Sequence, residues 1–166
     1  LSELNKSLLL ISKIDNRQFA PVEIVNFKEI FSRLIDDFKD YSAYRKIKII
    51  YTRRDNCQIK MNKNLAEILA LNLLKNAIFH NRQGGEVYIE LLPNQFRIEN
   101  TSNESALSSD KLFERFSSKP NMKGSTGLGL AIVKSIVEAS FLTVSYFYTG
   151  QKRHSIKIGS RNWELK

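Results

Sequence analysis

The sequence predicts an α/β (α+β) two-layer sandwich, in which a mixed, mostly antiparallel sheet is covered on one face by about three helices. Three observations support this fold class. Several long segments place apolar residues at the spacing of a helix, about six short segments resemble strands, and turn residues at Pro93-Asn94 and Thr149-Gly150 join strands into hairpins. With 166 residues, 42% of them hydrophobic, the chain is long enough for one domain with a sizeable core.

The expected helices follow from apolar residues at steps of three and four. Residues 1–17 are expected to form the first helix. Because an isolated helix of this length is only marginally stable, we expect it to pack against a partner outside this domain. Asn26 is expected to cap a second helix, and Asn62 or Asn64 a third at about 65–81. A short helix is expected at 110–116, and a last one follows the glycines at 124–129.

The expected strands are short runs of alternating or clustered apolar residues bounded by turn residues. They cover residues 46–52, 57–61, 86–92, 95–99, 141–148 and 155–158, and residues 22–25 are expected to be a short extended piece.

Composition narrows the function classes. The net charge of +9 is compatible with nucleic acid, an anionic membrane surface or a polyphosphate ligand, but the basic residues are scattered. The sequence contains no run of about 18 apolar residues, the length needed to span a membrane, and no pattern of a signal peptide. A single cysteine, Cys57, excludes an intrachain disulfide and is expected to fill a strand as a small apolar residue. Because the chain begins at Leu1 and not at a methionine, we expect a fragment of a longer protein.

The segment Gly124-Ser-Thr-Gly-Leu-Gly129 runs directly into the last helix. Glycines let the backbone approach a ligand closely, and the first turn of a helix offers N–H groups to an anion. The segment lacks the third glycine of a dinucleotide fold, since Ile132 stands there, and it lacks the ending of a Walker loop. By itself, the segment is about equally consistent with two interpretations. One is a phosphate-binding loop, and the other is a flexible loop followed by an ordinary amphipathic helix.

Three polar residues, Asn72, Asn76 and His80, lie four apart in the third helix and form one stripe. One interpretation is that the two asparagines lie on a solvated face of the helix and bind nothing. Ahead of a glycine-rich loop, an amide oxygen is also a reasonable Mg²⁺ ligand beside phosphates.

These motifs together resemble a known family. The order Asn72-Leu-Leu-x-Asn76-Ala, a hairpin, Lys111-Leu-Phe-Glu-Arg-Phe116 and then the glycine segment is similar to the ATP-binding domain of sensor histidine kinases, in the Bergerat-fold superfamily shared with gyrase and MutL. The resemblance covers residues 20–160. Residues 1–19 resemble the end of the second helix of the dimerisation and phosphotransfer hairpin plus a linker, and 161–166 form a C-terminal tail.

The resemblance implies ATP and Mg²⁺ as cofactors and Asn76 as the metal ligand. It implies a lid at 117–125 that is anchored by Phe113 and Phe116, with Lys119 and Lys123 as phosphate partners. The implied nucleotide-binding set is Asn72, Asn76, His80, Asn100, Phe116, Lys119, Lys123, Gly124, Ser125, Thr126, Gly127, Leu128, Gly129 and Leu130.

The sequence also departs from the family pattern. Asn100–Glu104 stands where the family has Asp-x-Gly-x-Gly, so we expect Asn100 to accept a hydrogen bond from adenine and ATP binding to be weaker than usual. Phe79 replaces a basic residue, and Lys75, on a different face, is an uncertain substitute. His80 and His154 lack the context of a phosphoacceptor histidine, and His154 is expected to be an ordinary histidine.

The resemblance implies the catalytic domain of a two-component histidine kinase, which phosphorylates a histidine upstream of Leu1. Because hydrolytic relatives carry a glutamate where Asn72 stands, phosphoryl transfer is favoured over hydrolysis. Its partners would be its own upstream helices, a second copy and a response regulator, and it would be a cytoplasmic domain of a membrane-anchored sensor. A degenerate scaffold of the same fold is the alternative, whereas a nucleic-acid-binding domain has only the net charge of +9 in its favour.

Overall fold

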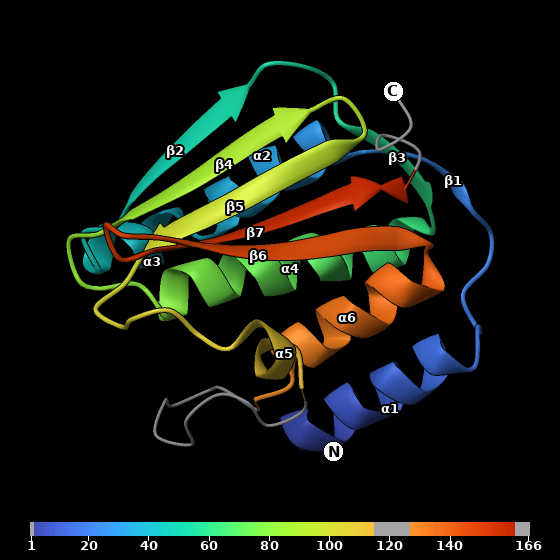
Figure 1. Ribbon diagram of the computed structural model, residues 1–166. Coiled ribbons are helices and arrows are strands. Elements are labelled where there is room, and N and C mark those ends of the chain that lie inside the picture. The colour runs from blue at the N-terminus through green and yellow to red at the C-terminus, as the bar shows by residue number, and fades with distance from the viewer. Residues whose placement is uncertain (1, 115–126, 162–166) are drawn as a thin grey trace.

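The computed structural model describes residues 2–114 and 127–161 (Figure 1). A five-stranded sheet has the order β2-β4-β5-β7-β6, and β1 and β3 form a separate two-stranded sheet. The strands are β1 (Glu23–Asn26), β2 (Lys48–Arg53), β3 (Gln58–Met61), β4 (Glu86–Leu92), β5 (Gln95–Thr101), β6 (Leu142–Thr149) and β7 (Arg153–Ser160). The helices are α1 (Glu3–Asp15), α2 (Phe27–Asp37), α3 (Lys39–Tyr44), α4 (Lys63–Phe79), α5 (Ser109–Leu112) and α6 (Gly129–Ala139).

Helices α2, α4 and α6 cover one face of the sheet (Figure 1). The strand β2 pairs in parallel with β4, whereas β4–β5, β5–β7 and β6–β7 are antiparallel. The predicted two-layer sandwich with a mixed, mostly antiparallel sheet is therefore confirmed.

Asparagine caps fix where two of the helices begin. The side chain of Asn26 accepts a hydrogen bond from the amide of Lys28 at 3.0 Å, and that of Asn62 accepts one from the amide of Leu65 at 3.1 Å. The carboxamide of Asn62 also donates to the carbonyl of Pro21 at 2.9 Å, which ties the start of α4 to the segment before β1. The short helix α3 was not predicted.

The core lies between the sheet and the helices. Phe27 and Phe31 of α2 pack on Phe96 of β5, with ring centroids 4.8 and 5.1 Å from that of Phe96.

A membrane-spanning helix is not found in the described part of the chain, where every helix is too short or too polar for that role.

The first helix was expected to pack against a partner outside this domain, but one of its faces packs against the domain itself. Ile11 and Ile14 are each 1% exposed, and α1 packs against α6. This placement buries two large aliphatic side chains, which stabilises α1 on the domain. Leu4 and Leu9 of α1 remain exposed.

Candidate functional site

The first part of the site is the contact between α4 and the start of α6. The amide nitrogen of Asn72 donates to the carbonyl of Ile68 at 2.8 Å, which fixes the side chain on the helix. Its oxygen then faces Gly129, because a Cβ built on that glycine would lie 3.3 Å from Asn72 Oδ1. Gly127 has a φ of 71°, a conformation that favours glycine, and Leu128 is fully buried. The predicted asparagine stripe and the glycine-opened helix therefore meet.

Asn76 and His80 continue the stripe toward the end of α4. Both are half-buried, and His80 is the residue that follows the last turn of the helix. Burial lowers the pKa of His80, while the charge of Glu104 opposes this and His154 adds to it. The eight steps from Asn72 to His80 span about 12 Å along the helix axis, so the stripe reaches from the glycine segment to the opposite end of the site.

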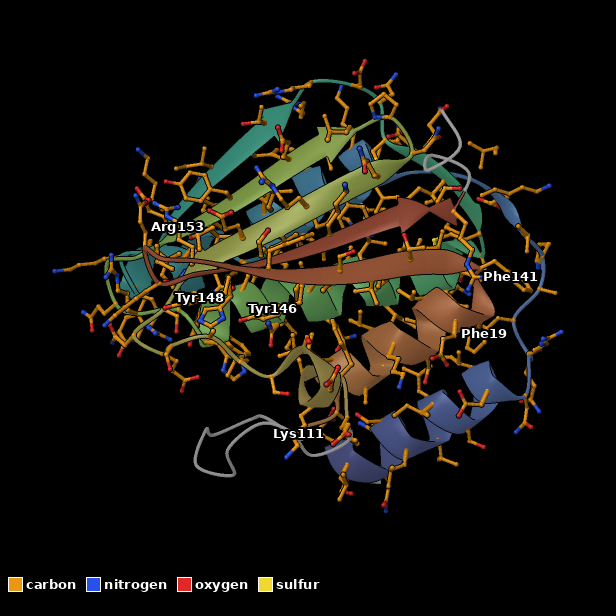
Figure 2. The ribbon with its side chains drawn as sticks, in the orientation of Figure 1. Phe19, Lys111, Phe141, Tyr146, Tyr148 and Arg153 are labelled. Carbon is orange, nitrogen blue, oxygen red and sulfur yellow. The ribbon has the colours of Figure 1, made fainter. Side chains whose placement is uncertain are left out.

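At that opposite end, Asn100 lies near the end of β5 and is 6% exposed. Its amide nitrogen donates to the carbonyl of Thr101 at 3.0 Å, and across the sheet it pairs with His154 of β7. His154 is 8% exposed, and the hydroxyl of Tyr146 lies 2.8 Å from its Nδ1. Tyr146 and Tyr148 lie on the side of the sheet that faces the helices (Figure 2).

A buried polar network joins this end of the sheet to α4. The hydroxyl of Thr101 donates to Asn81 Oδ1 at 2.7 Å and accepts from the amide of Glu86 at 2.8 Å. The amide nitrogen of Asn81 donates to the carbonyl of Glu86 at 2.9 Å. Gly85 lies inside this network, where a side chain would collide with it. The network therefore fixes the end of β5, with Asn100, relative to the end of α4, with His80.

Eight of the predicted site residues lie in the described part of the chain: Asn72, Asn76, His80, Asn100, Gly127, Leu128, Gly129 and Leu130. Of these, Asn72 and Gly129 lie close together. The others, Phe116, Lys119, Lys123, Gly124, Ser125 and Thr126, lie outside the described residues, as does most of the predicted tail. Phe113 packs against the core.

His154 and Tyr146 were not predicted as site residues. Their importance depends on the pairing of β5 with β7 and of β7 with β6, which places residues 100, 154 and 148 side by side. The available signal is the run of three aromatic residues at 146–148, which by itself predicts only a strand.

Lys75 lies next to Phe79, one helical turn further along α4. Its Nζ lies 5.8 Å from the ring centroid of Phe79, the residue that replaces the expected cation. The ring of Tyr41 packs against the same phenylalanine, with a centroid distance of 5.2 Å. Lys75 thus brings a positive charge next to the side chain of residue 79.

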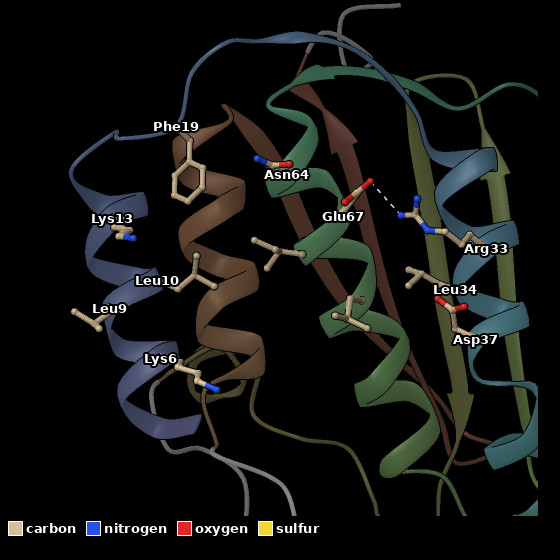
Figure 3. A pocket seen from close by; sticks show the side chains of 12 residues that line it. Lys6, Leu9, Leu10, Lys13, Phe19, Arg33, Leu34, Asp37, Asn64 and Glu67 are labelled. Atoms are coloured by element: carbon tan, nitrogen blue, oxygen red, sulfur yellow. Dashed lines mark ion pairs between the residues drawn. The ribbon is translucent and has the colours of Figure 1, made fainter. Parts of the chain in front are cut away.

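A separate groove of about 730 Å³ lies between α1 and α2 over the outer face of α4 (Figure 3). Leu9, Leu10 and Phe19 contribute apolar surface to it, and an ion pair of 3.1 Å joins Arg33 to Glu67. None of the predicted site residues lines this groove. The candidate site is therefore the region between α4, the start of α6 and the end of β5.

The fold is that of a known family of ATPase domains. Residues 61–161 match the family described as histidine kinase-, DNA gyrase B-, and HSP90-like ATPase. The chain belongs to this family.

Individual proteins agree with this assignment. The heme sensor protein HssS of Staphylococcus saprophyticus is 33% identical over 151 residues, which cover 87% of this chain and 33% of that protein. The chain thus spans about a third of the length of such relatives. The cytoplasmic segment of histidine kinase QseC has the same fold, with a TM-score of 0.70 and 17% identity over 96% of this chain and 95% of that one. Full-length ShkA in complex with AMPPNP superimposes with a TM-score of 0.72 and 16% identity over 95% of this chain and 35% of that one.

Proposed function

We propose that this chain is the catalytic domain of a two-component sensor histidine kinase and transfers the γ-phosphoryl group of ATP to a histidine upstream of Leu1. The observation that carries the proposal is the contact of Asn72 with Gly129, which joins the asparagine stripe of α4 to the glycine-opened start of α6. In this proposal, the site lies in the cytoplasm in a membrane-anchored sensor. Its partners are its own upstream helices, a second copy in a homodimer and a response regulator, with no nucleic acid.

The start of α6 suits the phosphates of the nucleotide. In the part of the chain that the structure describes, no side chain caps this helix. Its first N–H groups and the positive end of its dipole therefore favour an anion placed against Gly129. Gly127 and Gly129 lack side chains, so phosphate oxygens can approach the backbone there.

Asn76 fits the role of a Mg²⁺ ligand. Its carboxamide offers a hard oxygen from a half-buried position one turn after Asn72. Among the described residues, no group of three or more histidine, cysteine or acidic side chains could hold a metal. A Mg²⁺ ion that keeps water and phosphate oxygens needs only one or two protein ligands, so a single amide suffices. When bound, the ion neutralises phosphate charge.

Asn72 favours transfer over hydrolysis. Its side chain is an amide, and it is held by its hydrogen bond to Ile68. An amide does not accept a proton from water at neutral pH, so Asn72 cannot serve as a general base. The domain then contributes positioning and charge stabilisation, the main requirements of phosphoryl transfer.

Titration calorimetry with AMPPNP, with and without Mg²⁺, tests the nucleotide site. We expect Mg²⁺ to strengthen binding and Asn76→Ala to remove that increment. Asn64→Ala is the matched control, because Asn64 is an exposed asparagine in the first turn of the same helix. Equal responses of the two variants would refute the role of Asn76. Transfer itself is tested in the full-length protein by the formation of acid-labile phosphohistidine from ATP.

A scaffold without nucleotide is the second candidate, and the Asn100–Glu104 segment favours it. Ser102 and Glu104 replace glycine there, and Asn100 is a neutral acceptor. If Asn100 receives a hydrogen bond from adenine, Asn100→Ala should weaken AMPPNP binding further. No binding of AMPPNP to the wild-type chain at millimolar concentration would favour the scaffold.

A further inference from the structure

We propose that Tyr146 and His154 are positioning residues that hold the loop Ser102–Leu107 in the conformation that completes the base end of the nucleotide site. The inference rests on the proposed function, because it assigns a role at one end of the same site. It concerns the segment where this chain departs most from the pattern of its family.

The loop is attached to the β6–β7 hairpin at three points. The amide of Ser102 donates to the carbonyl of Lys152 at 3.0 Å, at the tip of the hairpin. The carbonyl of Glu104 lies 3.4 Å from Nε2 of His154. The amide of Leu107 donates to the hydroxyl of Tyr146 at 3.1 Å. Two of the three attachments are therefore made by side chains, one from each strand of the hairpin.

These contacts form one continuous chain, and with a neutral imidazole one arrangement of protons satisfies all of them. The hydroxyl of Tyr146 accepts from Leu107 and lies 2.8 Å from Nδ1 of His154, to which it can donate its own proton. Nδ1 is then unprotonated, and the neutral imidazole carries its proton on Nε2, which faces the carbonyl of Glu104. Burial raises the pKa of Tyr146, which keeps the proton on its hydroxyl.

The location of this chain of contacts connects it to the site. His154 pairs with Asn100 across the sheet, and the charge of Glu104 acts on His80 at the end of the asparagine stripe. The loop thus follows the predicted adenine acceptor along the chain, and its residue Glu104 acts on the end of α4. Because the segment Asn100–Leu107 contains no glycine, side-chain contacts and not glycine conformations determine its shape.

A loop that is already ordered loses less conformational freedom when a ligand binds, so it binds more tightly. Each lost hydrogen bond of this kind should weaken nucleotide binding by roughly fivefold, and loss of both side-chain attachments by roughly twentyfold. Tyr146→Phe removes the acceptor of the Leu107 amide. His154→Ala removes the contact with Glu104, and His154→Gln restores a donor near the position of Nε2.

The test combines calorimetry with AMPPNP and Mg²⁺ and amide exchange measured by NMR on the same proteins. We expect Tyr146→Phe and His154→Ala to weaken AMPPNP binding and to accelerate exchange of the Leu107 amide, and His154→Gln to recover much of the affinity. Tyr148→Phe is the matched control, because Tyr148 lies on the same strand with its ring 5.2 Å from that of His154. It should bind like the wild type.

The wild-type chain provides a measurement that does not depend on any variant folding. The imidazole ¹⁵N shifts of His154 should show an unprotonated Nδ1 and a protonated Nε2 at neutral pH, and AMPPNP should slow exchange at Leu107. The opposite tautomer would overturn the inference. Unchanged affinity in Tyr146→Phe and His154→Ala would overturn it while the proposed function stands. No AMPPNP binding to the wild type would overturn both.

Discussion

Replacing Gly85 by alanine should destabilise the domain severely, because the new methyl group has no space. A Cβ on Gly85 would lie 2.0 Å from Asn81 Oδ1 and 2.4 Å from Thr101 Oγ1, and 2.9 Å from the backbone oxygen of Arg82. The first two atoms are hydrogen-bonded to each other at 2.7 Å, so neither can move away without breaking that bond. The third belongs to the backbone and cannot rotate aside.

The magnitude follows from these contacts. Overpacking of a tight site costs about 1–3 kcal/mol, and a buried polar group that loses its partner costs about 1–3 kcal/mol. We therefore expect the free energy of unfolding to fall by about 3 kcal/mol, which lowers the melting temperature of a domain of this size by about 6–12 °C. Urea unfolding followed by circular dichroism measures the change directly.

Gly150→Ala is the matched control for Gly85→Ala. No atom lies within 4 Å of the Cβ position at Gly150, so the free energy of unfolding should change by no more than about 0.5 kcal/mol. In a background with Asn81→Ala and Thr101→Ala, where both side-chain collisions are removed, Gly85→Ala should cost at least about 1 kcal/mol less. A Gly85→Ala protein that unfolds like the wild type would refute this account of the network.

Three further predictions concern other parts of the chain. Gly129→Ala should weaken AMPPNP binding severalfold in calorimetry, because its Cβ would lie 3.3 Å from Asn72 Oδ1. Its free energy of unfolding should stay the same or rise by up to about 1 kcal/mol, since alanine favours a helix; a parallel loss of stability would contradict this. Burial raises the pKa of Cys57 to about 12, so Ellman's reagent should react with the native thiol about a thousandfold more slowly than with the urea-unfolded chain; equal rates would show that Cys57 is accessible. Because burial lowers the pKa of His80, the unfolded state binds its proton first as the pH falls. The contribution of His80 to the free energy of unfolding is therefore complete above the ordinary histidine pKa and is lost as the pH falls from there through the native pKa. In urea unfolding measured at a series of pH values, His80→Gln should make the free energy of unfolding depend less on pH in this range. An unchanged pH dependence would exclude His80 as its source.

The parts of the structure that depend on neighbouring residues could be predicted from the sequence. The caps at Asn26 and Asn62 act over two or three residues, so a local pattern is enough to find them. Helix α3 was missed because Lys39–Tyr44 has no apolar repeat, and of these residues only Ser42 is buried. The packing of α1 on α6 could not be inferred either, since a helical pattern identifies the apolar face but not its partner.

The same distinction applies to the site. The resemblance implied that Asn72 and Gly129 belong to one site, because the amide stripe and the glycine-opened helix each have a recognisable local pattern, and the two residues lie close together in the structure. The pairing of Asn100 with His154 depends on strand register, which no short motif specifies. His154 was therefore expected to be an ordinary histidine, although both of its nitrogens have polar contacts with groups next to the site.

The two ends of the site are built by different means, and this affects how each responds to substitution. At the start of α6, backbone groups and glycines form the surface, so any added side chain takes up space that a phosphate would need. At the end of β5, Tyr146 and His154 contact the loop Ser102–Leu107. Those contacts can be weakened one at a time, so substitutions there should reduce affinity in steps and leave the phosphate end intact. Under the proposed function, a base-binding loop without glycines retains nucleotide binding because side chains order it in their place.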